Sequence, residues 1–147
     1  MTRAGEVPAA TSGHHTLPHT ADLTIEAWAP TREDCFTEAL KGLTGAFAEV
    51  MVQEPPTTVP IDLAPVGDEE LLVALLEEVI YLAEVPGVVA VNARFEPVEA
   101  GGLRGCIETV PIDRVELIGS APKGVSRHGL RFARAGDEWR CRATIDV

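Results

Sequence analysis

The sequence predicts an α+β fold: a two-layer domain with a largely antiparallel mixed sheet and two main helices. Three observations carry this prediction. A strand-like alternation precedes the first helical segment, two segments repeat apolar residues at helical spacing, and the last third of the chain consists of strand-like segments separated by turn residues. With 147 residues, the chain is long enough to bury the core of one domain.

The chain begins with a segment that has no periodicity. Residues 1–13 are rich in Ala, Pro, Thr, Ser and Gly, so we expect a flexible lead-in followed by a single domain over 14–147. The first predicted strand is LTIEAWA at 23–29. Its odd-numbered residues are expected to face the core, and its outer face then carries Asp22, Thr24, Glu26 and Trp28.

The first helix is predicted from about 32 to 50. Thr31 is a candidate N-cap with Asp34 three residues on, and aromatic and leucine side chains recur at helical spacing after it. Four prolines then occur in the segment 53–67, which allows only a short strand near 59–63.

The second helix is predicted to begin at Asp68 and to end before Pro86-Gly87. Acidic residues in its first turn suit the positive end of the helix dipole. Its apolar face is wide and consists of Leu71, Leu72, Leu75, Leu76, Val79, Ile80 and Leu82.

The remaining segments are predicted strands. They cover approximately 88–96, 103–110, 125–133 and 138–146. Gly101-Gly102 and Ala135-Gly136-Asp137 are turn sequences, so two of the connections are expected to be hairpins.

The charge of the chain argues against independent binding to nucleic acid. The formal net charge is −11: residues 1–93 carry −12, and residues 94–147 carry +1. Affinity for phosphate backbones comes from Lys and Arg, so cations or a basic partner protein are better candidate ligands. No apolar run approaches the length of a membrane span, and the N-terminal residues lack a signal-peptide core, so we expect a cytoplasmic protein.

The three cysteines are widely spaced. Cys35, Cys106 and Cys141 form no C-x-x-C pair, a pattern that favours reduced, buried thiols over a disulfide framework or a zinc cluster.

Two aspartates stand at corresponding ends of predicted strands. In the last strand, Asp146 alternates with the apolar residues and therefore faces away from the core, as Asp22 does in the first strand. If these strands are neighbours, the two side chains meet, and the terminal carboxylate of Val147 lies beside them. Such a cluster repels itself unless a cation lies between the carboxylates, and oxygen ligands favour Ca²⁺ or Mg²⁺ over zinc. The alternative is that both aspartates are solvated strand-end residues.

Histidines and arginines offer weaker candidates. His19 lies three residues before Asp22, and His128 shares the apolar parity of its strand; for both, a structural role competes with a role as a base. Six basic residues between Lys123 and Ile145 could contact an anion, or could be an ordinary exposed strand face. The motifs typical of hydrolases, nucleotide-binding loops and zinc proteases are absent from the sequence.

Three separated segments together resemble the archease family. PHTADLTIEAWA at 18–29 is similar to the family's opening strand, LLVALLEEVIYL at 71–82 to its second helix, and KGVSRHGLRFARAGDEWRCRATIDV at 123–147 to its closing hairpin. The resemblance implies a non-enzymatic activator of the GTP-dependent tRNA-splicing RNA ligase, which joins a 3′-phosphate end to a 5′-hydroxyl end. It also implies that the activator promotes guanylylation and repeated turnover of the ligase.

The resemblance also implies a site for a divalent cation. The family's metal ligands match Asp22, Asp146 and the C-terminal Val147, with Ca²⁺ expected and Mg²⁺ or Mn²⁺ as alternatives. A ligase of RNA repair is an alternative partner. Two other functions stay open: a metal-dependent phosphoesterase in which His19 assists a water molecule, and a metal-free chaperone that binds proteins through its acidic helices.

Overall fold

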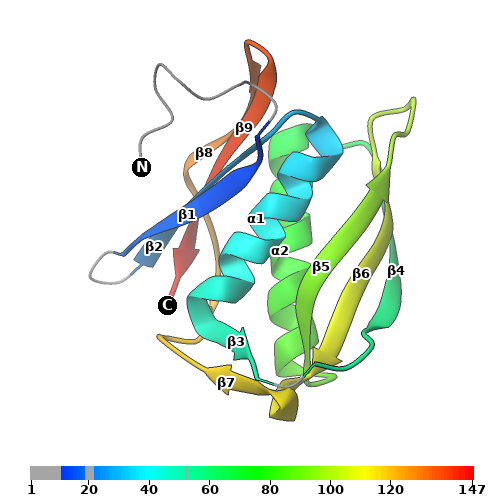
Figure 1. The fold of residues 1–147 in the computed structure, drawn as a ribbon. Coiled ribbons are helices and arrows are strands. Elements are labelled where there is room, and N and C mark those ends of the chain that lie inside the picture. The colour runs from blue at the N-terminus through cyan, green and yellow to red at the C-terminus, as the bar shows by residue number, and fades with distance from the viewer. Residues whose placement is uncertain (1–10, 19–21, 52) are drawn as a thin grey trace.

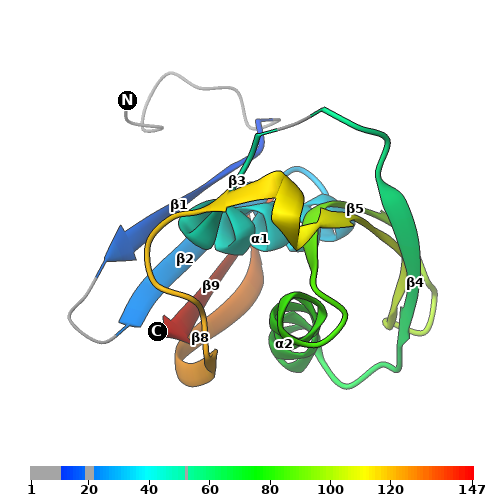
Figure 2. The same ribbon diagram turned by 90° about the horizontal axis from the view of Figure 1, so that it is seen from below.

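Two helices lie between two antiparallel sheets. The structure is a computed structural model that describes residues 11–18, 22–51 and 53–147. In Figures 1 and 2, a sheet of four strands covers one side of the helices and a sheet of three strands covers the other. The predicted α+β class with two main helices and largely antiparallel strands is therefore confirmed. The strands form a sheet on each side of the helices rather than the single sheet layer of the predicted two-layer arrangement.

The strands form three sheets within the described residues, and every described pairing is antiparallel. The four-stranded sheet has the order β1 (Gly13–Pro18), β2 (Asp22–Ala29), β9 (Glu138–Asp146) and β8 (Gly124–Ala135). The three-stranded sheet has the order β4 (Thr57–Leu63), β6 (Leu103–Pro111) and β5 (Val88–Glu96). A small ribbon pairs β3 (Ala48–Val50) with β7 (Val115–Leu117), which follows a short 3₁₀ turn at Ile112–Arg114.

The first helix, α1, covers Arg32–Phe47. Thr31 is its N-cap, as predicted, and its hydroxyl accepts a hydrogen bond of 3.1 Å from the Asp34 N–H. The helix ends three residues earlier than predicted. Ala48 adopts an extended conformation and pairs with Leu117, so the segment predicted as the last helical turn forms β3 instead.

The second helix, α2, covers Asp68–Glu84 and matches the prediction closely. The seven apolar residues predicted for its face are all buried. They form such a wide face because α2 contacts β8 on one side and β5 on the other. Neither helix in the described part of the chain combines the length and apolar character needed to cross a bilayer.

One aromatic side chain joins the two sheets through α1. Phe36 is fully buried. Its ring stacks on Phe132 of β8 with centroids 4.2 Å apart and meets Phe95 of β5 edge-on at 6.5 Å. The core therefore runs without interruption from one sheet to the other.

A partly buried arginine fixes the starts of both helices. Arg32 donates to Asp68 in the first turn of α2 at 2.9 Å, and to the carbonyls of Gly101 and Gly102 in the β5–β6 turn at 2.9 and 3.1 Å. These charge-assisted bonds tie α1, α2 and the three-stranded sheet together at one end of the molecule.

Three strands were not predicted. β1 has the polar sequence GHHTLP, and β3 and β7 have only three residues each, so none of them carries a clear alternation. β1 forms because its backbone pairs with the edge of β2 from Gly13–Trp28 to Pro18–Leu23.

The strand β8 is interrupted by a bulge. Ser126 faces Thr144 and Arg131 faces Arg142, so five steps along β8 correspond to two along β9. Gly129 within the bulge has φ +71°, a conformation that a residue with a β-carbon rarely adopts.

Replacing Phe36 tests the role of this contact between the sheets. We expect Phe36→Ala to lower the free energy of unfolding by roughly 3–5 kcal/mol, because a fully buried ring is removed and a cavity is left. Phe95→Ala is the matched control, since Phe95 is only partly buried, and should cost less. Urea denaturation followed by circular dichroism measures both. A loss below about 1 kcal/mol for Phe36→Ala would contradict the proposed role of this ring.

Candidate functional site

The two predicted aspartates lie directly opposite each other. β2 and β9 are neighbours, and the register pairs Asp22 with Asp146 at one end of the four-stranded sheet. Opposite residues of an antiparallel pair share one face of the sheet. The adjacent pair, Leu23 and Ile145, packs into the core, so the aspartates lie on the outer face.

The backbone around Asp146 is held from both sides. β9 is an inner strand of the sheet, and Asp146 faces Asp22 across β2 and Gly124 across β8. The Lys123 N–H donates to the Asp146 carbonyl at 2.7 Å. Gly124 carries no side chain, and a β-carbon there would meet nothing within 4 Å. Asp146 itself is exposed.

The last residue of the sequence lies at the same end of the sheet. Val147 follows β9 directly, and its half-buried side chain packs against the core. Figure 1 shows the C-terminus beside the start of β2. The packing of this side chain holds the last residue close to the two aspartates.

The chemistry of these donors suits a hard cation. Asp22, Asp146 and the terminal carboxylate supply oxygen atoms only, the ligand type of Ca²⁺ and Mg²⁺. Among the described residues, no three His, Cys, Asp or Glu side chains form a group suited to a metal. Asp22 and Asp146 provide two facing carboxylates at this end of the sheet.

The next outer pair separates the carboxylates from the rest of the sheet face. Thr24 and Thr144 are opposite each other and are both buried. The Thr144 hydroxyl donates to the carbonyl of His128 in the β8 bulge at 3.1 Å. The bulge therefore lies against the outer face directly beside the aspartate pair.

The histidines differ from the sequence-based expectation. His19 lies outside the described residues. His128 is exposed rather than directed to the core, because the bulge breaks the alternation on which its assignment depended. His14 and His15 belong to β1, where His14 contacts Glu38 at 2.8 Å and His15 contacts Glu26 at 2.5 Å.

The cysteines do not form a reactive or metal-binding cluster within the described residues. Cys35 and Cys141 are buried and Cys106 is half-buried, and all three are free thiols, as predicted. A hydrogen bond with the Cys35 thiol and burial both raise the pKa of Cys141 well above its usual value. Cys141 therefore stays protonated and unreactive at neutral pH.

Four of the six basic residues near the end of the chain line one part of the outer face, whereas Arg127 pairs with Glu70 of α2. Arg131, Arg140 and Arg142 come together there with His15, Glu26 and Trp28 from the first two strands, beyond the threonine pair. The sequence indicated the arginines but not their partners. β1 supplies one of them, and its polar sequence gave no strand signal.

The chain matches a known family along nearly all of its length. The model of the archease protein family matches residues 14–147. A Mycobacterium tuberculosis (strain H37Rv) protein named "Probable protein archease" is 41% identical over 140 residues, which cover 95% of this chain and 78% of the relative. "Protein archease" of Methanopyrus kandleri is 29% identical over 136 residues, which cover 89% of this chain and 96% of the relative.

Two solved structures share the fold. The solution structure of protein 1598 of Methanobacterium thermoautotrophicum aligns with a TM-score of 0.66 at 16% identity, covering 92% of this chain and 99% of that chain. The crystal structure of a Thermotoga maritima protein described as "an archease, possible chaperone" aligns with a TM-score of 0.51 at 19% identity, covering 89% and 94%.

The facing aspartates make a prediction about stability. With EDTA present, Asp146→Asn should raise the free energy of unfolding by roughly 0.2–1 kcal/mol, because like charges directly opposite on neighbouring strands destabilise the pair. Asp137→Asn, in the exposed β8–β9 turn, removes the same charge without a facing carboxylate and should have a smaller effect. Urea denaturation at low salt measures the difference. A lower stability for Asp146→Asn would contradict the predicted repulsion.

Proposed function

The chain belongs to the archease family, and from this premise we propose that it is a non-enzymatic activator of a GTP-dependent RNA ligase of the tRNA-splicing type. In this proposal, the protein promotes guanylylation of the ligase and its repeated turnover. The Thermotoga maritima relative, described as a possible chaperone, agrees with a role exerted on another protein.

One observation carries the proposal. Asp22 and Asp146 face each other at an end of the sheet where Gly124 leaves space beside them. Two carboxylates so placed present negative charge outward from a rigid strand pair. Strand pairing on both sides of β9 preorganises the group before a partner arrives.

We propose that Asp22, Asp146 and the terminal carboxylate of Val147 form a divalent-cation site, with Ca²⁺ as the preferred ion. When bound, the cation would supply positive charge that neutralises the carboxylates and can attract phosphate oxygens. The role of each carboxylate is to ligate the ion and to hold it at the outer end of the sheet. None of them acts as a nucleophile.

The charge of the chain supports a basic protein as the partner. The net charge is −11, and an enzyme that binds RNA must present a positive surface. Opposite charges increase the rate of encounter and orient the two proteins before contact. The acidic protein then acts on the enzyme rather than on the RNA, which it would repel.

The aspartates can be tested with limiting ligase. Asp22→Ala and Asp146→Ala should each abolish the stimulation of multiple-turnover ligation, because each removes one of the facing carboxylates. Asp137→Ala, which changes an exposed aspartate in the β8–β9 turn, is the matched control and should stimulate normally. Circular dichroism and denaturation establish that the variants are folded. Normal stimulation by both site variants would refute the proposed role. Phosphodiester hydrolysis by the protein alone would indicate the phosphoesterase instead.

The cation site can be tested without the ligase. Calorimetry should detect Ca²⁺ binding to the wild-type chain, and Asp146→Asn should weaken it by at least roughly tenfold. One glycine added after Val147 moves the terminal carboxylate away and should weaken binding as well, whereas a glycine added before Met1 should not. If the wild-type chain binds neither Ca²⁺ nor Mg²⁺ nor Mn²⁺, the metal-free chaperone is the better description.

A further inference from the structure

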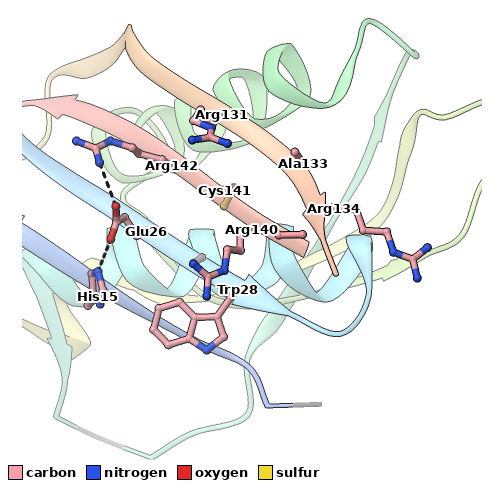
Figure 3. Close-up of a pocket in the computed structure, with 11 residues that line it drawn as sticks. His15, Glu26, Trp28, Arg131, Ala133, Arg134, Arg140, Cys141 and Arg142 are labelled. Atoms are coloured by element: carbon pink, nitrogen blue, oxygen red, sulfur yellow. Dashed lines mark hydrogen bonds and ion pairs between the residues drawn. The ribbon is translucent and has the colours of Figure 1, made fainter. Parts of the chain in front are cut away.

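A pocket of about 370 Å³ lies on the outer face of the four-stranded sheet, at the end away from Asp22 and Asp146. Figure 3 shows that all four strands contribute to it. Its volume falls within the range of pockets that bind small molecules. Thr24 and Thr144, with the β8 bulge against them, separate the pocket from the carboxylates. Glu26, the pocket residue of β2 nearest to Asp22, lies four residues along the strand from it, which corresponds to about 13 Å, so the pocket is a distinct site.

Arginines surround the pocket. Arg131, Arg140 and Arg142 project over the outer face, and Arg134 stands near the turn that joins β8 to β9 (Figure 3). Within the described residues, Arg131 has no carboxylate partner. Arg142 pairs with Glu26 at 3.1 Å and is 45% exposed, so this exposed pair adds little stability and leaves donors available.

The pocket also contains a fixed carboxylate. Glu26 accepts from His15 Nε2 at 2.5 Å and from Arg142 Nη1 at 3.1 Å (Figure 3). These contacts from two neighbouring strands orient the carboxylate and compensate part of its charge. The Glu26 carboxylate can accept hydrogen bonds from hydroxyl groups of a ligand, while the surrounding arginines keep the pocket positive.

An aromatic ring forms one side of the pocket. The Trp28 indole lies against the backbone of β1, and a β-carbon on Gly13 would lie only 2.5 Å from its Cζ2 atom. The His15 ring meets the indole edge-on with centroids 5.5 Å apart. Because Gly13 has no side chain, the Trp28 ring can pack against the backbone of β1. The ring contributes apolar surface to the pocket beside the arginines.

We propose that this pocket binds a free nucleotide. Arginines bind phosphate oxygens through paired N–H groups. An indole packs against a base, and a carboxylate accepts from ribose hydroxyls. These three components lie within one pocket of suitable size. The ligand is a mononucleotide rather than a nucleic-acid strand, because the net charge of −11 repels a long polyanion while the arginines attract a compact anion locally.

The test uses the full chain alone, with EDTA present so that the carboxylate end holds no divalent cation. The probes are guanosine and adenosine monophosphate, inorganic phosphate, and a short single-stranded oligouridylate. Calorimetry gives the affinities. Fluorescence reports the ligand at the pocket, because the chain has two tryptophans, of which Trp28 lines the pocket and Trp139 packs against Phe132.

We expect the monophosphates to bind more tightly than inorganic phosphate and to change the fluorescence of the wild-type chain but not of Trp28→Phe. Arg131→Ala/Arg142→Ala should weaken binding by roughly tenfold or more, since a hydrogen bond to a charged group contributes about that factor. The matched control is Arg94→Ala/Arg104→Ala, which removes the same charge from the three-stranded sheet and should bind normally.

Three outcomes would overturn the proposal: equal affinity for inorganic phosphate and nucleotides, equal losses in the two double variants, or tighter binding of the oligouridylate than of the monophosphates. Because neither ligase nor metal is present in the experiment, its result is independent of the proposed activator function.

Discussion

The fold depends on burying both sides of its helix layer. α1 and α2 each contact the four-stranded and the three-stranded sheet, and Phe36 extends from one to the other through Phe132 and Phe95. Because the helices fill the space between the sheets, each sheet has one face in the core and one outer face free for polar chemistry. Arg32 reinforces this arrangement by joining the starts of both helices to the β5–β6 turn. The acidic site and the arginine pocket both lie on the outer face of the four-stranded sheet.

The register between β2 and β9 arranges that outer face. Proceeding along the strand pair, Asp22 faces Asp146, Thr24 faces Thr144, Glu26 faces Arg142 and Trp28 faces Arg140. The face thus changes from two carboxylates, through a buried hydroxyl pair, to an arginine and tryptophan surface. If the pairing of the two strands shifted by one residue, the polar side chains would point into the core. The apolar residues that alternate with them therefore fix the register. The core therefore determines the positions of both polar groups.

The uneven charge of the molecule connects its two proposed activities. Acidic residues dominate the first part of the chain, and the arginines of β8 and β9 form a local exception on one sheet. An acidic protein with a preorganised carboxylate end suits a basic enzyme as its partner, and a confined positive pocket suits a small anion. The two surfaces lie on one rigid sheet but are separated by the β8 bulge, so each can act without the other.

The sequence by itself determined the presence of both helices, the long strands and the outward orientation of Asp22 and Asp146, because these depend on local periodicity. The seven apolar residues of α2 and the Thr31 cap are examples. The tertiary structure decided the features that depend on pairing between distant segments, namely the short strands and the position of His128. β1 and the β3–β7 ribbon exist because neighbouring strand edges accept their backbones, although their own sequences carry little pattern. His128 is exposed because a bulge with Gly129 breaks the alternation of β8. Parity along a strand assigns a face to Asp22 and Asp146, but only the pairing of β2 with β9 makes them neighbours, since adjacency of distant segments is a property of the packed core.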